Sequence, residues 1–286
     1  MRETLAAIIK KHHVMIRNPL VLAFLLLTSI LYSQSADEFI KLGDDNFNSR
    51  NYSNAINFYK KSLSIDSLQG ATYLKLGLAF FYSEKDEDAL KNFNLAIKLN
   101  PNNPDTYFYR AQSLTYLNDK QGALSDYAKT IDLDSNYIDA YVKRAYVFLS
   151  LGIPDAAFVF FHKAIMKNPN QPADVYFSRG YCYQDSKAYF QAIEDYSKAI
   201  QLKPDYADAY LNSGNCQVEL KNNDKALALY QEALKISPSN WRIYSGMGHA
   251  YFYKNEIEKA CESWTKSLEL GSPTTQEYID KNCRKR

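Results

Sequence analysis

The sequence predicts an all-α protein in which seven helix pairs stack one after another. Three observations support this fold class. A motif recurs every 34 residues with one insertion near Pro172, large and small residues inside each copy fall at spacings of three and four, and many copies end with a polar residue followed by Pro. Spacings of three and four place side chains on one face of a helix. A motif repeated at a fixed period indicates a stacking unit, because a catalytic site usually occurs once in a chain.

The first helix of each copy is marked by an aromatic residue and, four residues later, by Gly or Ala. The aromatic column is Phe39, Tyr73, Tyr107, Tyr141, Tyr176, Tyr210 and Tyr244. The small column is Gly43, Gly77, Ala111, Ala145, Gly180, Gly214 and Gly248. Because a tiny side chain lets a facing helix approach closely, the small column predicts the contact inside each pair.

The second helix of each copy is marked by Ala and, four residues later, by an aromatic residue that fills the space beside the small column. The Ala column is Ala55, Ala89, Ala123, Ala157, Ala192, Ala226 and Ala260, and the aromatic column is Tyr59, Phe93, Tyr127, Phe161, Tyr196, Tyr230 and Trp264. Pairs such as Asn100-Pro101 end this helix, because the residue before Pro avoids the helical region. The copies span residues 36–69, 70–103, 104–137, 138–171, 173–206, 207–240 and 241–274.

A capping helix and a basic tail are expected over residues 275–286. Gly271 is a good end for the preceding helix, and Ser272 or Thr274 can cap the next one. Cys261 and Cys283 then lie at the same level, about 14–16 Å from the turn in an antiparallel pair. The sequence therefore predicts a Cys261–Cys283 disulfide, and the alternative is two free thiols on different faces.

The other two cysteines, Cys182 and Cys216, occupy the same place in adjacent copies. Equivalent positions on neighbouring stacked helices lie roughly 9–10 Å apart, which exceeds the reach of a disulfide. We expect both to be small buried packing residues.

Residues 1–33 are predicted to be a signal peptide. An apolar run from Leu20 to Leu31 follows positive charges and precedes small residues, and it is shorter than the about 20 residues of a membrane span. Cleavage after Ser33 or Ser35 and a start at Met15 both fit the pattern. An exported protein, periplasmic or extracellular, with no stable membrane span after cleavage is expected. An uncleaved leader that anchors the protein in the membrane and a cytosolic protein with a buried N-terminal helix are the alternatives.

The columns of aromatic, Gly or Ala, Ala, aromatic and Pro resemble the tetratricopeptide repeat, in seven copies that cover nearly all of the chain after the leader. This resemblance implies a right-handed α-solenoid superhelix of antiparallel helix pairs with a concave groove. The family's best-known peptide mode clamps a terminal carboxylate with Lys, Asn and Arg. The corresponding places here begin with Ile40, Leu74 and Phe108, so the clamp for acidic tails is missing.

Charge and composition argue against nucleic-acid binding and catalysis. The formal net charge is +2, and the first 33 residues contribute +3 of it, which leaves −1 for the rest of the chain. His162 and His249 have no Cys, Asp or Glu at the spacing of metal ligands. The sequence also contains no phosphate-binding Gly loop, nucleophile elbow or Cys-x-x-Cys motif. We expect no enzymatic activity, no cofactor and no metal.

An arginine column replaces Leu just before the small column in three consecutive copies. Arg110 and Arg179 are each followed, sixteen residues later, by Asp126 and Asp195. The pairs Arg110–Asp126 and Arg179–Asp195 are predicted to be ion pairs that hold two helices together. Arg144 has Phe160 at the corresponding place, so it either contacts a neighbouring copy or serves as a functional charge.

The remaining face of each first helix is expected to line the groove implied by the resemblance, and it is rich in aromatic residues. The candidate partner-binding residues are Phe81, Tyr82, Phe108, Tyr109, Tyr116, Tyr146, Phe177, Tyr181, Phe252 and Tyr253. A large exposed apolar surface usually marks an interaction site. The sequence therefore favours a non-enzymatic interaction scaffold of the bacterial envelope that binds a protein or peptide. A non-catalytic small-molecule or glycan binder that uses the same groove is the alternative.

Overall fold

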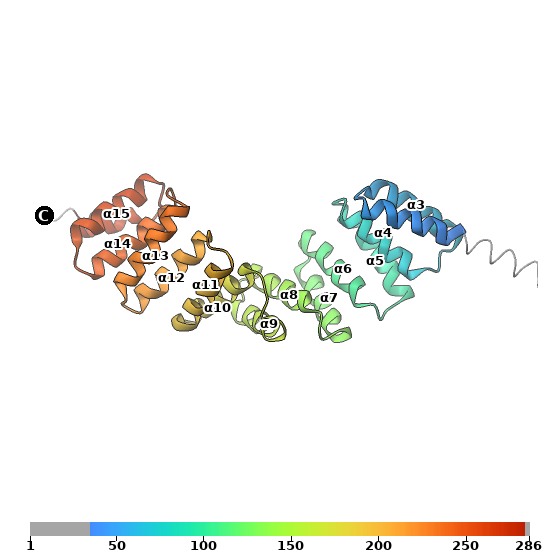
Figure 1. Cartoon of the computed structure of the whole chain (residues 1–286), viewed down its shortest axis with the longest axis horizontal. Coiled ribbons are helices and arrows are strands. Elements are labelled where there is room, and N and C mark those ends of the chain that lie inside the picture. Colours follow the sequence, from blue (N-terminus) through green and yellow to red (C-terminus); the bar gives the residue numbers. More distant parts are fainter. Residues whose placement is uncertain (1–34, 284–286) are drawn as a thin grey trace, which may run out of the picture. The chain divides into compact units, whose positions relative to one another are not determined.

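The computed structural model describes residues 35–283, and within this range all regular structure is helical (Figure 1). A helix over residues 35–48 comes first. The following helices are α3 (Tyr52–Ile65), α4 (Gly70–Phe81), α5 (Asp86–Leu99), α6 (Pro104–Tyr116), α7 (Lys120–Leu133), α8 (Ile138–Ser150), α9 (Pro154–Lys167), α10 (Ala173–Asp185), α11 (Tyr189–Leu202), α12 (Ala207–Glu219), α13 (Asn223–Ile236), α14 (Trp241–Tyr253), α15 (Ile257–Glu269) and α16 (Thr275–Asn282).

The helices pack as consecutive pairs in two compact units, one ending at Ser135 and one beginning at Asn136. In unit 1, α4 packs on α5 and α6 packs on α7, and α5 also packs on α6. In unit 2, the pairs α8–α9, α10–α11, α12–α13 and α14–α15 follow the same rule. This arrangement confirms the predicted all-α solenoid of helix pairs. The insertion lies between α9 and α10, where residues 168–172 form a connection one residue longer than residues 203–206.

The core of each pair is the contact between the small column and the aromatic column. A Cβ atom added to Gly77 would lie 2.5 Å from the Phe93 ring, and one added to Gly214 would lie 2.5 Å from the Tyr230 ring. Both rings are almost fully buried. Side chains at these two glycine positions would therefore push the helices of the pair apart.

The two helices of a pair are joined by a tight turn that contains one residue in the left-handed region. Its φ lies between 59° and 63° at Arg50, Glu84, Asn118, Lys187, Lys221 and Asn255, and it is 71° at Gly152. In the pair α4–α5, the backbone N–H of Lys85 donates to the carbonyl of Phe80. This turn brings the end of the first helix beside the start of the second, in the same way in every pair.

Helix α16 covers the last pair. Tyr278 of α16 stacks on Trp264 with ring centroids 5.4 Å apart, and it meets His249 edge-on at 4.6 Å. Cys261 and Cys283 form a disulfide with their Cα atoms 5.8 Å apart. Gly271, with φ of 94°, makes the turn before α16. Helix α16 is thus held against the last pair by ring stacking and by a covalent link.

The predicted leader and the last three residues of the predicted basic tail lie outside the described residues, which exclude residues 1–34 and 284–286. Among residues 35–283, no helix has both the length and the apolar character that crossing a membrane requires.

Candidate partner-binding site

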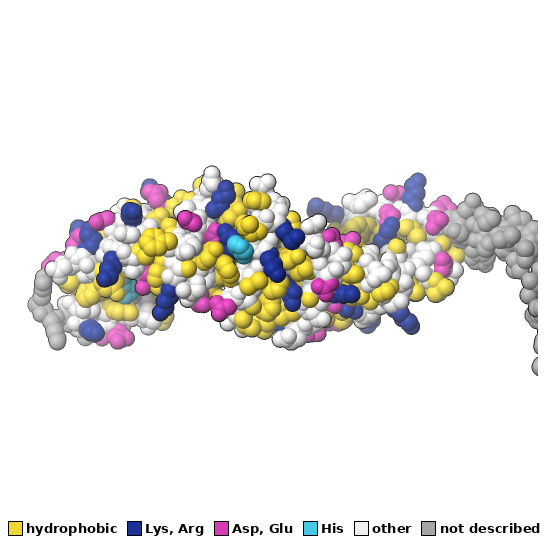
Figure 2. Space-filling view, turned by 90° about the horizontal axis from the view of Figure 1, so that it is seen from below, with side chains coloured by type: hydrophobic (Ala, Val, Ile, Leu, Met, Phe, Trp, Pro, Cys, Tyr) yellow, Lys and Arg dark blue, Asp and Glu magenta, His cyan; other side chains and the backbone are white. Residues whose placement is uncertain are grey.

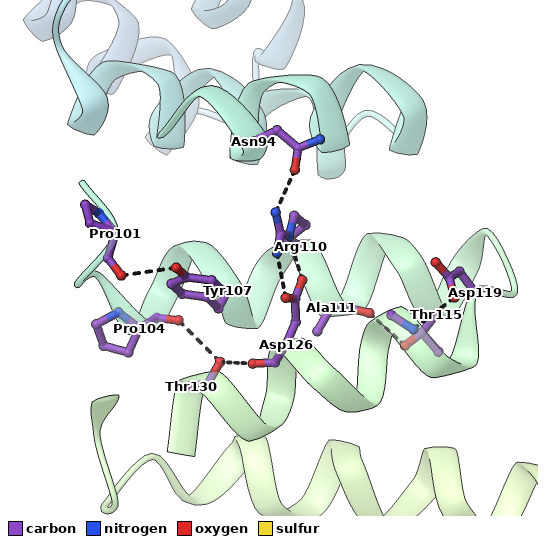
Figure 3. Close-up of polar contacts among 11 residues, drawn as sticks. Asn94, Pro101, Pro104, Tyr107, Arg110, Ala111, Thr115, Asp119, Asp126 and Thr130 are labelled. Carbon is purple, nitrogen blue, oxygen red and sulfur yellow. Dashed lines mark hydrogen bonds and ion pairs between the residues drawn. The ribbon is translucent and has the colours of Figure 1, made fainter. Parts of the chain in front are cut away.

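Arg110 joins three helices of unit 1 (Figure 3). Its Nε and Nη2 each donate to one carboxylate oxygen of Asp126, at 2.6 Å, and its Nη1 donates to Oδ1 of Asn94 at 2.7 Å. The Asp126 side chain is only 7% exposed. A two-point arginine–carboxylate contact with this burial fixes α6 against α7, while Asn94 ties the pair to α5.

Arg179 repeats this arrangement in unit 2. Its Nε and Nη2 donate to the two oxygens of Asp195 at 2.7 Å, and Nη1 lies 3.4 Å from Nδ1 of His162 on α9. Burial raises the pKa of Asp195, and the hydrogen bonds from Arg179 hold back part of that rise. These ion pairs therefore act in helix packing.

Arg144 occupies the same column in the pair α8–α9 but has a different neighbour. Its guanidinium lies over the Phe160 ring at 4.4 Å from the ring centroid. This contact is a cation–π interaction within the pair, with an aromatic ring in place of the carboxylate.

The predicted groove residues of unit 1 gather into one aromatic cluster, formed by Phe47, Tyr52, Phe81, Tyr82, Tyr109 and Tyr116. Tyr82 stacks on Tyr52 at 5.7 Å and meets Phe81 at 5.3 Å, and Phe81 lies 5.8 Å from Tyr116. Tyr82 is 45% exposed and Tyr116 is 71% exposed. Sequence reasoning missed Tyr52, which lies at the start of a second helix rather than on a first helix.

Phe108 does not belong to this surface, which corrects the prediction. It is 6% exposed and packs edge-on against Tyr127 with ring centroids 5.8 Å apart. The face of α6 that carries Phe108 turns toward the second helix of its own pair, so the side chain contributes to the core.

In unit 2 the predicted residues are dispersed. Tyr146 packs edge-on against Phe161 at 5.1 Å, and Phe177 stacks on Tyr206 at 4.8 Å. Tyr181 is 45% exposed and lies on α10. At the other end of the unit, Phe252 contacts Trp264 at 5.7 Å and the exposed Tyr253 at 6.0 Å. These residues therefore form separate contacts along unit 2.

The unit 1 cluster borders a cavity of about 490 Å³, which we call the unit 1 pocket. Its lining residues are Phe81, Tyr82, Glu84, Asp86 and Tyr116. The pocket forms where the turn after α4 places Glu84 and Asp86 beside the end of α6. Sequence reasoning missed both carboxylates, although the segment SEKDED after the aromatic pair was a visible signal.

Asp86 is in an unusual environment for a carboxylate. Burial raises its pKa, and the nearby Ser113 hydroxyl counters part of that rise. No hydrogen bond of normal geometry joins Ser113 to the buried Oδ1, which has no other hydrogen-bond partner among the described residues. The Ser113 hydroxyl is likewise buried without a hydrogen-bond partner within residues 35–283, so these two polar atoms lie close together between α5 and α6.

A second cavity, of about 330 Å³, lies at the matching place in unit 2. Its lining residues are Val218, Glu219, Lys221, Asn223 and Tyr253. Each lining residue of this cavity comes 137 positions after a lining residue of the unit 1 pocket, from Phe81 and Val218 at one end to Tyr116 and Tyr253 at the other. We call this cavity the unit 2 pocket. The repeat thus builds one kind of pocket twice, with different side chains.

Another exposed apolar surface lies elsewhere in unit 2. Figure 2 shows hydrophobic side chains gathered over α8 and α9 on the face that it displays. The exposed large apolar residues of this region are Ile153, Val159 and Met166.

The thiols and the potential metal ligands complete the chemistry of the described residues. Cys182 and Cys216 are buried free thiols, and burial raises the pKa of each to about 12. Neither is a thiolate at neutral pH. Within residues 35–283, no group of three or more His, Cys, Asp or Glu residues is placed to hold a metal ion.

A family model described as TPR repeat matches residues 77–117, 180–221 and 214–255. Several solved structures have a similar fold. One is YrrB, described as a TPR protein with an unusual peptide-binding site; it is 23% identical, covers 66% of this chain and 97% of its own, and gives a TM-score of 0.61. No curated protein matches the chain.

Two further solved structures are similar over much of the chain. The C-terminal part of a TPR repeat-containing protein from Cytophaga hutchinsonii is 20% identical, covers 84% of this chain and 98% of its own, and gives a TM-score of 0.67. MamA protein is 25% identical, covers 62% of this chain and 94% of its own, and gives a TM-score of 0.56.

Proposed function

This chain is a tetratricopeptide repeat protein, and from that premise we propose that it is a scaffold that binds a peptide segment of another protein at the aromatic cluster of unit 1. The repeat is defined by its packing residues, so the site residues decide what is bound. Tetratricopeptide repeat proteins bind protein partners, and the non-catalytic role proposed here follows that pattern.

The observation that carries the proposal is the continuity and exposure of this cluster. Tyr52, Tyr82, Phe81 and Tyr116 form an unbroken series of ring contacts across three helix pairs. Two of these rings, Tyr82 and Tyr116, are among the exposed large hydrophobic side chains of the chain. Exposed aromatic residues supply large contact area at small entropic cost, and they are enriched where proteins bind one another.

A peptide suits this surface better than a flat protein face does. The rings follow the ends of successive first helices, and the unit 1 pocket opens beside them. An extended segment can lay alternate side chains against such a row. The peptide-binding site named for YrrB supports this kind of ligand, although the likeness to that protein extends to the fold alone.

Export to the bacterial envelope is part of the proposal. The Cys261–Cys283 disulfide supports it, since disulfides persist in oxidising compartments and are rare in the cytosol. The leader pattern of residues 1–33 supports it independently. A fusion of the leader to alkaline phosphatase, which is active only after export, tests this part: an inactive fusion would contradict it.

The binding part is tested by selecting peptides from a random display library on the purified full chain. We expect the selected peptides to lose at least about tenfold in affinity for a Tyr82→Ala, Tyr116→Ala variant, a loss of about 1.4 kcal/mol. Tyr253→Ala is the matched control, because Tyr253 has the position of Tyr116 in the unit 2 pocket. Peptides that bind the double variant as well as the parent would overturn the proposal and direct attention to the surface over α8 and α9.

A small-molecule or glycan binder is the second candidate, favoured by the volume of the unit 1 pocket. About 490 Å³ lies within the range of small-ligand sites, and aromatic rings stack well on sugar faces. Thermal unfolding with a panel of glycans tests this candidate. A saturable rise in melting temperature that disappears in the Tyr82→Ala, Tyr116→Ala variant would favour it over the peptide.

A further inference from the structure

The unit 1 pocket combines two kinds of group that rarely meet on a solvated surface. Three aromatic residues, Phe81, Tyr82 and Tyr116, line it together with the carboxylates of Glu84 and Asp86. Aromatic rings attract cations through their quadrupole, and carboxylates attract them through charge and hydrogen bonds. Both kinds of group therefore favour the same class of ligand.

The local charge around the pocket is negative. Residues 84–88 carry four carboxylates and one lysine, Lys85. Asp88 is paired with Lys91, outside the pocket. Asp86 begins α5, and its Oδ1 is buried without a hydrogen-bond partner among the described residues. The matching oxygen of unit 2, Oδ1 of Asn223, is also buried without a hydrogen-bond partner in the described part of the chain, so what distinguishes the unit 1 pocket is the negative charge of Asp86 and Glu84.

The unit 2 pocket shows that the repeat does not require this chemistry. At the places of Phe81 and Tyr82 it has Val218 and Glu219, and at the places of Glu84 and Asp86 it has Lys221 and Asn223. Residues 221–225 carry two lysines and one aspartate. Since the same turn and the same helix ends build both pockets, packing does not demand an aromatic and acidic lining.

We propose that the unit 1 pocket is a subsite for a lysine or arginine side chain of the bound peptide. This inference rests on the proposed function, because it assumes that the ligand is a peptide, and it adds the charge that the peptide carries. The side chain's methylene groups contact Phe81, Tyr82 and Tyr116, and its cationic end lies between Glu84 and Asp86. An acidic side chain is repelled from this place, and a neutral one gains no charge interaction with either carboxylate.

The proposal is tested with two small probes. Nα-acetyl-lysine methylamide carries the cation, and Nα-acetyl-norleucine methylamide has a similar apolar chain without it. Each is titrated into the purified, isotope-labelled full chain, and backbone amide signals are followed by NMR. We expect the lysine probe to shift the amides of Tyr82, Glu84 and Asp86, and to bind at least about tenfold more tightly than the norleucine probe.

The variant Glu84→Gln, Asp86→Asn removes the charge and keeps the shape of the pocket. It should lower the affinity of the lysine probe at least about tenfold and leave the norleucine probe unchanged. Glu219→Gln in the unit 2 pocket is the matched control and should change neither. If Asp86→Asn lowers the melting temperature, then Glu84→Gln alone decides, because the Glu84 side chain is exposed. For Glu84→Gln alone we expect the affinity of the lysine probe to fall about threefold.

Equal affinity for the two probes would overturn the subsite. So would amide shifts caused by the lysine probe that persist in the Glu84→Gln, Asp86→Asn variant, or that are equally large at the unit 2 pocket. The peptides selected on the full chain distinguish a failure of the subsite proposal from a failure of the scaffold proposal. Peptides lost by Tyr82→Ala, Tyr116→Ala but retained by Glu84→Gln, Asp86→Asn would leave the scaffold proposal standing and overturn the subsite. Peptides retained by both variants would overturn both.

Discussion

The unit 1 pocket and the unit 2 pocket have the same backbone origin but differ in charge, with two carboxylates in the lining of the first and one carboxylate and one lysine in the lining of the second. Each forms at the end of a first helix, at a turn with one left-handed residue, and beside the end of the next first helix. The left-handed residue is Glu84 in one pocket and Lys221 in the other. The position of a pocket therefore follows from the repeat, whereas its ligand follows from side chains that the repeat leaves free.

This difference explains why a family resemblance says little about a partner. The small and aromatic columns fix the distance between helices, and they are the same in both units. Residues 84–88 and 221–225 lie at equivalent turns, are exposed or partly exposed, and share no such constraint. A search for function in a repeat protein is therefore best directed at the positions where equivalent repeats differ in charge.

The largest expected effect comes from removing the carboxylate of the arginine–aspartate pair in each unit. It tests whether the two units are packed in the same way although their pockets differ. Asp126→Ala and Asp195→Ala should each lower the free energy of unfolding by about 3 kcal/mol, because each leaves a largely buried arginine without its carboxylate. Arg179 is less exposed than Arg110, 12% against 21%, so the loss should be larger for Asp195→Ala. Urea denaturation measures both.

Asp88→Ala is the control for these variants. Its partner is the exposed Lys91, and exposed pairs contribute little to stability. A loss for Asp126→Ala or Asp195→Ala no larger than that of the control would mean that the arginine column does not hold the helices together.

The next effect comes from exchanging the charges of the two pockets. Glu84→Lys with Asp86→Asn gives unit 1 the residues that unit 2 has at these two places and should reduce lysine-probe affinity at least about tenfold, or about 1.4 kcal/mol. The reverse change, Lys221→Glu with Asn223→Asp, should create weaker binding in unit 2, since Val218 and Glu219 replace two rings there. NMR titration reads both. Undiminished binding to the first variant would show that charge does not distinguish the pockets.

A smaller effect is expected at the left-handed turns themselves. Lys221→Gly should raise the free energy of unfolding by about 0.5–1 kcal/mol, because a left-handed conformation is costly for a residue with a Cβ atom and Gly adopts it freely. Glu84→Gly should stabilise unit 1 by a similar amount and weaken lysine-probe binding. Asn118→Gly should change stability least, since Asn tolerates this region. A destabilised Lys221→Gly variant would refute this explanation.

The smallest effect is a pH response confined to unit 2. Burial lowers the pKa of His249, which lies between Trp264 and Tyr278 and lines a cavity that also contains Glu219. The folded protein favours the neutral ring, so the unfolded chain takes up a proton first as the pH falls below the usual histidine pKa, and stability decreases there. Thermal unfolding at neutral and mildly acidic pH should show this decrease in the parent chain.

The variant His249→Gln introduces the residue found at the matching place in unit 1, Gln112. It should make the melting temperature less sensitive to acidification. The same sensitivity in parent and variant would assign the response to other groups.

The sequence predicted the fold well because the columns that define it recur in every copy. It also placed Arg110 and Arg179 sixteen residues before a carboxylate, which the helix pair brings within hydrogen-bonding distance. The candidate site was harder to predict, because the face of a first helix is shared between solvent and its neighbours. Phe108 and Phe177 have the spacing of groove residues, yet one packs on Tyr127 and the other on Tyr206.

Glu84 and Asp86 were missed for a different reason. They lie in a turn and at the start of a second helix, so helical periodicity does not single them out. They become part of a site only because Tyr116, from the next pair, closes the pocket. A feature that depends on three segments at once leaves no regular pattern in the sequence.

The packing beneath α16 also provides an optical reporter. The chain has two tryptophans, Trp241 and Trp264, and both belong to unit 2, where Trp264 is 1% exposed and stacked on Tyr278. Tryptophan emission therefore follows unit 2, while far-UV circular dichroism follows every helix. Solenoids gain much of their stability from contacts between neighbouring repeats, so a difference between the two unfolding curves would show directly where cooperativity along the chain breaks.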